Sequence, residues 1–329
     1  IRAYHIAEEL SQEHDVRLVS TDSCDISHPR FPCLQTNHEG LRQHERWCDV
    51  LIFQGFTMAK APWLRDSTKV IIPDLYDPMH LEQLEQTRGQ DPLRRGNDVA
   101  STTNAINEQL VRGDFFLCAS EKQRDFWLGQ LAAVGRINPH TYDADSSLQS
   151  LIGVCPFGLP TEPPCRTRPA IKGVVPGIDP DDKVILWAGG IYDWFDPLSL
   201  ISAVDRLRHR RPDVRLYFMG MRHPSVPPMR LAAEAQQLAA KLGLTDKVVF
   251  FNQGWVDYDD RQNFLLDADV GVSTHFDHVE TRFAFRTRIL DYLWAGLPIV
   301  ATRGDTFGDL VAAEELGVAV PDENVDALV

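Results

Sequence analysis

Cysteine is scarce in this chain, and long apolar runs are missing altogether. The six cysteines among 329 residues form no Cys-x-x-Cys pair and show no metal-ligand spacing with histidine, so zinc sites and redox motifs are not indicated. No apolar run approaches the roughly 18 to 20 residues that span a bilayer, and no signal peptide opens the sequence. We therefore expect a cytoplasmic protein that needs neither a metal nor a cofactor.

Positive charge is also in short supply. Lys and Arg number 33 against 47 Asp and Glu, which gives a formal net charge of −14. General nucleic-acid binding needs clustered cations, so this composition argues against nucleic acid as a partner. The sequence also lacks a basic amphipathic helix, which disfavours a peripheral membrane contact. A Gly-x-Gly-x-x-Gly turn after a strand is absent as well, and this disfavours a nicotinamide dehydrogenase.

What the chain does contain is a regular alternation of short apolar runs with helix-length segments. Such runs, when they are apolar throughout, are typical of parallel strands that helices cover on both faces. The alternation therefore predicts an α/β fold of doubly wound parallel sheets. The predicted strands are 16–20, 49–53, 69–72 and 115–119 in the first half, and 183–190, 214–220, 247–251 and 269–272 in the second.

A proline-rich stretch separates the two halves. Six prolines lie between Pro160 and Asp182 among Gly, Thr and charged residues, a composition that cannot continue a helix or a central strand. We therefore predict a first domain at 1–160, a linker at 161–182 and a second domain at 183–329.

Both ends of the sequence lead us to expect a trimmed chain. The first residues, 1–14, read as a helix, so we expect that a strand and its Gly-rich turn precede them. The last residues, 323–329, stop inside what reads as the start of another helix.

The most informative stretch is 279–304, which reads as a loop, a short helix, a tight turn and a buried strand. Thr287 is a candidate N-cap, and Gly296 suits a left-handed C-cap before the apolar run that Pro298 opens. The loop before the helix carries Glu280 together with three guanidinium groups, those of Arg282, Arg286 and Arg288. A helix N-terminus attracts anions, and Arg adds forked donors that match phosphate.

The sequence from 290 to 302, LDYLWAGLPIVAT, resembles the pattern carboxylate, aromatic, x, x, Ala, Gly, x, Pro, Val of the retaining glycosyltransferases of family 4, which have the GT-B fold. The resemblance implies two Rossmann-like domains that face a cleft, the first for the acceptor and the second for a nucleotide-sugar donor. It implies that the loop and the helix hold the diphosphate, and that Asp291 contacts the ribose. Phe283 stands where the family has its first acidic residue, and we expect Glu280 to replace it. Arg288 and Asp291 also fit a plain surface ion pair at i, i+3.

The residues just after each predicted strand are also candidates for ligand binding, because ligands bind at the carboxyl ends of strands in doubly wound sheets. In the second half these residues include Gly189, Gly190, Arg222 and the segment 275–280. The Gly pair lets a backbone approach a phosphate closely, although it also fits an ordinary turn. The family carries Gly-Arg and Lys-Gly here, and this chain lacks both cations. The positive charge for the diphosphate must then come from elsewhere, and the candidates are the four arginines at 222, 282, 286 and 288.

In the first half, Asp74 and Asp77 follow the strand at 69–72, where the family often shows His-Asp. Both fit ordinary turn chemistry too. We take Asp77 and Glu280 as candidate catalytic residues.

The resulting hypothesis is a hexosyltransferase that moves a sugar from a nucleotide sugar to an acceptor, with retention and without metal. Stabilising the departing diphosphate would be its largest task. Two alternatives stay open: a nucleotide-sugar epimerase, and a non-catalytic GT-B-like accessory subunit. The acceptor is open among a polysaccharide, a lipid-linked sugar, a small metabolite and a protein.

Overall fold

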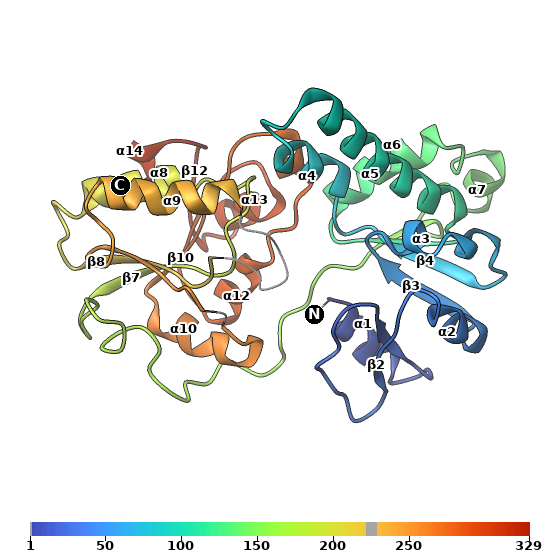
Figure 1. The fold of residues 1–329 in the computed structure, drawn as a ribbon, viewed down its shortest axis with the longest axis horizontal. Helices are drawn as coiled ribbons and strands as arrows, with labels where there is room; N and C mark the ends of the chain where they lie inside the picture. The colour runs from blue at the N-terminus through green and yellow to red at the C-terminus, as the bar shows by residue number, and fades with distance from the viewer. Residues whose placement is uncertain (1, 222–228, 255) are drawn as a thin grey trace. The chain divides into compact units, whose positions relative to one another are not determined.

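The computed structural model describes residues 2–221, 229–254 and 256–329, and it shows an α/β protein built of parallel sheets (Figure 1). The chain divides into two compact units, Ile1–Gly158 and Leu159–Val329. Each unit has its own sheets and its own buried side chains, so each is described by itself.

Unit 1 contains a four-stranded and a two-stranded parallel sheet. The larger sheet has the order β3-β4-β5-β6, and the smaller one pairs β1 with β2. The strands are β1 (Leu18–Ser20), β2 (Cys33–Gln35), β3 (Val50–Gln54), β4 (Val70–Asp74), β5 (Phe116–Cys118) and β6 (Ile152–Val154). The helices are α1 (Arg2–Leu10), α2 (Leu41–Trp47), α3 (Thr57–Lys60), η1 (Pro62–Asp66), α4 (Met79–Gln86), α5 (Pro92–Arg112), α6 (Glu121–Ala133) and α7 (Pro139–Ala144).

Unit 2 is organised around a six-stranded sheet in which every neighbouring pair is parallel. Its order is β12-β11-β10-β7-β8-β9. The strands are β7 (Lys183–Trp187), β8 (Val214–Phe218), β9 (Val249–Phe251), β10 (Val270–Ser273), β11 (Ile299–Thr302) and β12 (Gly317–Val320). The helices are α8 (Pro197–Leu207), α9 (Arg230–Lys241), η2 (Tyr258–Asp260), α10 (Arg261–Asp267), α11 (Val279–Phe283), α12 (Arg288–Trp294), α13 (Thr306–Ala313) and α14 (Val325–Leu328).

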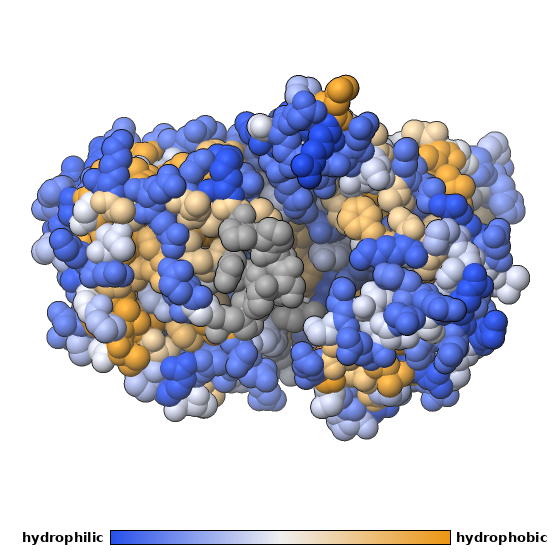
Figure 2. All heavy atoms as spheres, in the orientation of Figure 1, coloured by the Kyte–Doolittle hydropathy of each residue, from blue (hydrophilic) through white to orange (hydrophobic). Residues whose placement is uncertain are grey.

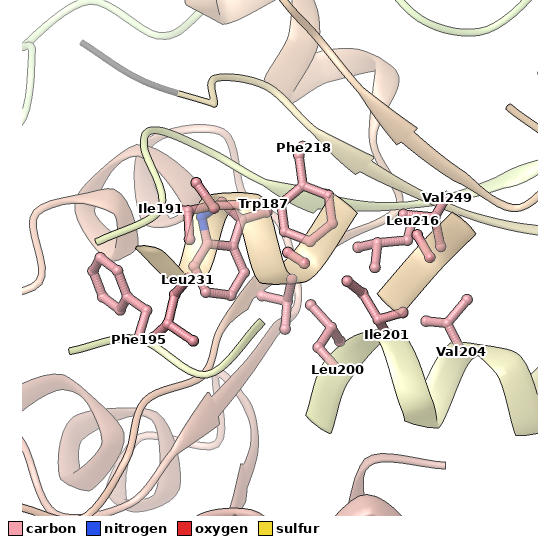
Figure 3. Close-up of a cluster of buried hydrophobic side chains, with 14 of the residues drawn as sticks. Trp187, Ile191, Phe195, Leu200, Ile201, Val204, Leu216, Phe218, Leu231 and Val249 are labelled. Atoms are coloured by element: carbon pink, nitrogen blue, oxygen red, sulfur yellow. The ribbon is translucent and has the colours of Figure 1, made fainter. Parts of the chain in front are cut away.

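Side chains on both faces of this sheet are buried, as the continuous apolar runs of the sequence predict. In Figure 1, α8 and α9 cover one face while α10 and α12 cover the other. Neighbouring residues of a strand therefore enter different cores: Trp187 packs on the α8 side, and Leu186 packs on the α12 side. Figure 3 shows part of the first core, where side chains of α8 lie opposite Leu216 of β8 and Val249 of β9.

The segment 161–182, which the sequence predicts as a linker, lies in unit 2. Ala170, Ile171 and Ile178 are buried in the core on the α12 side, and the carboxylate of Asp267 accepts hydrogen bonds from the backbone N–H groups of Ala170 and Ile171. These contacts make part of the segment a packed component of the second unit.

Hydrophobic residues on the molecular face drawn in Figure 2 are scattered in small groups among hydrophilic ones. Among the helices that the structure describes, none combines the length and the apolar character needed to cross a bilayer.

Candidate functional site

The topology of unit 2 creates a switch point between β7 and β10. From β7 the chain proceeds to β8 and β9 on one side, and then returns to add β10 and β11 on the other side. The connections after β7 and β10 therefore leave the sheet on opposite sides, and ligands of doubly wound sheets bind in the crevice that opens at such a point. The residues that follow these two strands are 188–192 and 274–280.

Gly189 and Gly190 follow β7 at this edge. Gly189 has φ +96°, a conformation that L side chains rarely adopt, and a Cβ added there would meet open space. The backbone requires glycine at this position, and it leaves room for a group to approach the turn.

Arg288, the first residue of α12, is buried beside this turn. Its guanidinium lies 4.4 Å from the ring centre of Trp187 and 4.1 Å from that of Phe195, and its Nη2 donates to the carbonyl oxygen of Gly190 at 2.8 Å. Its Nη1 is buried without a hydrogen-bond partner among the described residues. Burial lowers the pKa of Arg288 to about 10, so the group stays charged at neutral pH. The result is an anchored cation with an N–H left to bind a ligand.

Arg286 and Glu280 form a second buried pair. Arg286 Nη2 donates to Glu280 Oε2 at 2.7 Å, and both side chains are at most 5% exposed. Arg286 Nε lies 4.0 Å from Asp305 Oδ2, while Glu280 Oε1 has no hydrogen-bond partner in the described part of the chain. Burying a charge is costly unless it is paired, so these two groups depend on each other.

Histidines complete this polar cluster. His275 follows β10, and its Nε2 lies 3.6 Å from Asp305 Oδ2. Burial and the nearby positive charge of Arg286 lower the pKa of His275 to about 3, so the ring is neutral at physiological pH. His278 Nδ1 lies 3.6 Å from Glu280 Oε2 and accepts from Thr281 N–H. Polar atoms left unpartnered in one buried cluster indicate a place for water, an ion or a ligand.

Asp291 has a different partner from the one that sequence spacing suggests. Arg261 Nε donates to Asp291 Oδ1 at 3.0 Å, whereas Arg288 reaches Gly190 instead. The Arg261 guanidinium lies over the rings of Tyr258 and Trp294. Burial raises the pKa of Asp291, and the hydrogen bond from Arg261 opposes that rise. The alternative interpretation of Arg288 and Asp291 as an i, i+3 ion pair is therefore wrong.

The structure does not place the other residues predicted for the site in this buried cluster. Arg282 is exposed on α11, and Arg222 lies outside the described residues. Thr287 occupies the N-cap position of α12 as predicted, but its side chain makes no capping hydrogen bond. Asp77 belongs to unit 1, where it lines a pocket of about 160 Å³ at the ends of β3 and β4 together with Gln54 and Gln109.

Two residues near the candidate site, Asp305 and Arg261, were not predicted from the sequence. Asp305 follows β11, so the rule that flags residues after strands would have found it. Arg261 carries no local signal, because its partner Asp291 lies 30 residues away. Within the described ranges, His, Cys, Asp and Glu side chains do not gather in threes that would hold a metal ion.

The comparisons with known proteins point to the same half of the chain. Residues 182–329, somewhat less than half of the sequence, match the family model described as Glycosyl transferases group 1. No curated protein matches the sequence.

Solved structures of glycosyltransferases resemble the chain over nearly its whole length. Sucrose-phosphate synthase from Thermosynechococcus elongatus has a TM-score of 0.64 at 14% identity, with 99% of this chain and 79% of that chain covered. WaaG, a glycosyltransferase involved in lipopolysaccharide biosynthesis, has 0.63 at 16% identity, with 99% and 84% covered. Anabaena HepE in complex with UDP and glucose has 0.56 at 15% identity, with 88% and 69% covered. These likenesses confirm the predicted α/β fold of GT-B type.

Proposed function

We propose that this protein is a glycosyltransferase that takes a sugar from a nucleotide-sugar donor bound at the carboxyl ends of β7 and β10. The observation that carries the proposal is the pair of buried arginines, Arg286 and Arg288, which hold unpartnered N–H groups at the switch point. The family-model match covers the unit that contains them. Buried cations with free donors suit an anion such as a diphosphate.

Each side chain of the cluster has a chemical task in this proposal. Arg288 Nη1 and the backbone at Gly189 and Gly190 bind the diphosphate, which is the leaving group. Donors fixed in a buried site stabilise the negative charge that develops as the glycosidic bond breaks, and they need no reorganisation at that moment. Glu280 Oε1 accepts a hydrogen bond from a hydroxyl of the donor sugar, and the Asp291 carboxylate accepts one from a ribose hydroxyl.

Retention of configuration and independence from metal belong to the same proposal. The buried guanidinium groups supply the positive charge that a cation would otherwise provide. In unit 1, Asp77 is the candidate to receive the proton of the acceptor hydroxyl, since it lines a pocket at the ends of two strands. The acceptor itself stays open among glycans, lipid-linked sugars, small metabolites and proteins.

Uridine diphosphate sugars are the first donors to test, because Anabaena HepE was solved with UDP-glucose and with UDP and glucose. The protein is incubated with UDP-, GDP- and ADP-sugars in EDTA, with and without a mixture of glycan and lipid-linked acceptors. Chromatography then follows the nucleotide, the sugar and the products. We expect release of one nucleoside diphosphate that acceptor accelerates and that Glu280→Gln and Arg288→Ala reduce at least about a hundredfold.

Other results of this assay separate the alternatives. Conversion of the donor to an epimer with the diphosphate still attached indicates a nucleotide-sugar epimerase. No turnover of any donor, from protein shown to be folded, indicates an accessory subunit and contradicts the proposal.

A further inference from the structure

The Tyr292 hydroxyl occupies an unusual place in unit 2. Tyr292 lies on α12 and is fully buried. Its hydroxyl oxygen accepts a hydrogen bond from Ala188 N–H at 2.9 Å, and the hydroxyl lies 3.0 Å from the carbonyl oxygen of Leu186 and 2.9 Å from that of Val272. Leu186 belongs to β7 and Val272 to β10, so one side-chain atom reaches the backbone of both strands.

This place is the point where β7 and β10 part. Their ladder ends with the pair Gly271 and Leu186, whereas β7 and β8 stay paired to the last residue of both strands. The backbone groups at and just beyond the last pair need other partners, because buried N–H and C=O groups are rarely left unbonded. The Tyr292 hydroxyl supplies these partners at the switch point itself.

The sequence of β10 fits this arrangement. A Cβ atom at Gly271 would overlap the Tyr292 ring, so only glycine leaves room for the aromatic side chain on this strand. Burial raises the pKa of Tyr292 to about 12, which keeps the hydroxyl protonated and able to donate. A bulky ring over a glycine, with its hydroxyl between two strands, fixes the position of α12 closely.

The same helix is tied to the turn after β7 at a second point. Arg288 lies one helical turn before Tyr292, and its Nη2 bonds Gly190 O. Tyr292 bonds Ala188 N, so the two contacts flank Gly189, whose left-handed backbone forms the turn.

We propose that Tyr292 is a positioning residue: its hydroxyl holds the turn 188–190 against α12, and so orients Gly189, Gly190 and Arg288 toward the donor diphosphate. The inference rests on the proposed function for the ligand, but the contact between α12 and the turn is testable without one.

The test compares Tyr292→Phe with Tyr217→Phe in the full chain. Tyr217 is also buried in the α12-side core, and its hydroxyl makes no hydrogen bond to a described residue, so it controls for removal of a phenol oxygen from a tyrosine of that core. Hydrogen exchange reports the amides of 188–190, and calorimetry reports the dissociation constants of UDP, GDP and ADP. We expect Tyr292→Phe to speed exchange at Ala188 and to weaken binding of the preferred nucleotide at least tenfold, whereas Tyr217→Phe changes neither.

The outcomes separate this inference from the proposed function. If wild type binds none of the three nucleotides, the proposed function fails, and exchange at Ala188 alone decides whether the contact exists. If wild type binds one of them but Tyr292→Phe binds it equally well, the positioning role is overturned.

Wild type provides a further measurement should Tyr292→Phe not fold. Ala188 should exchange as slowly as the ladder amides of β7, and nucleotide should slow exchange across 188–190. Rapid exchange at Ala188 in wild type, or exchange across 188–190 that bound nucleotide leaves unchanged, would overturn the inference.

Discussion

Individual buried charges strongly affect the stability of unit 2. Glu280 and Arg286 are almost fully buried and joined by a 2.7 Å hydrogen bond. A buried pair of this kind adds little net stability, since desolvation offsets the attraction. Removing one partner, however, leaves the other as an unpaired buried charge. Such an arrangement makes sense where charges are needed for binding.

Arg286→Met should therefore destabilise the protein more than its loss of hydrogen bonds suggests. It leaves Glu280 buried without its cation, and we expect a loss of about 3 kcal/mol in the free energy of unfolding, measured by urea denaturation. The double variant Glu280→Gln/Arg286→Met should recover part of this loss. Equal stability of Arg286→Met and wild type would show that the pair is not buried as described.

A second residue-scale prediction concerns acid. Burial lowers the pKa of His80 to about 4, and the ring stacks on Phe126. Between about pH 6.5 and pH 4 the unfolded chain binds more protons at this site than the folded chain does, so stability falls as the pH falls through this window. His80→Phe should remove about 3 kcal/mol of the loss between pH 7 and pH 4. The free energy of unfolding of both proteins is measured from pH 7 to pH 4. Equal losses in the two proteins would contradict the prediction.

At the scale of elements, the segment from α12 to β11 shows how local sequence sets local structure. Gly296 has φ +65°, and two bonds, Leu297 N–H to Tyr292 O and Gly296 N–H to Leu293 O, close the end of α12. This is a left-handed helix end of the Schellman type. The predicted glycine cap is confirmed by the backbone.

Two glycine substitutions should have opposite effects. Gly296→Ala forces an L side chain into the left-handed conformation and should cost about 1 kcal/mol of stability. Gly129 lies inside α6, and a Cβ there meets open space, so Gly129→Ala should add up to about 1 kcal/mol through helix propensity. Calorimetric melting temperatures measure both. A rise for Gly296→Ala would argue against the described helix end.

The helices also show which structural features can be predicted from the sequence and which cannot. Ser120 is of a residue type that favours the N-cap position, and its side chain accepts a hydrogen bond from Gln123 N–H at the start of α6. Helix α5 begins at Pro92, because Asp91 caps it and proline suits a first helical position. Helix capping depends on residues that are neighbours in the sequence, so it can be predicted from the sequence. The partner of Asp291 is Arg261, and such distant pairing follows from packing that no local pattern contains.

At the scale of the whole molecule, the fold class followed from the alternation of apolar runs, whereas the role of the proline-rich segment did not. Proline excludes regular structure, but Ile171 and Ile178 between the prolines still bury their side chains in unit 2. A segment without helix or strand can therefore still pack into a hydrophobic core.

A fragment that begins at residue 183 should consequently be less stable than one that begins at residue 159. The shorter fragment lacks two buried isoleucines and leaves apolar surface of the α12-side core in water, at about 2 kcal/mol for each side chain. Expression followed by thermal denaturation compares the two. Equal melting temperatures would show that the segment does not contribute to the core.

The central claim is that nucleoside diphosphate binds at the carboxyl ends of β7 and β10. Calorimetry with UDP, GDP and ADP in EDTA tests it most directly, on wild type, Arg288→Ala, Asp291→Ala and the surface control Arg206→Ala, whose side chain pairs with Asp326. We predict that one nucleotide binds wild type and the control equally, and that both site variants weaken its binding at least tenfold. Binding that survives in both site variants, or no binding by folded wild type, would contradict the account.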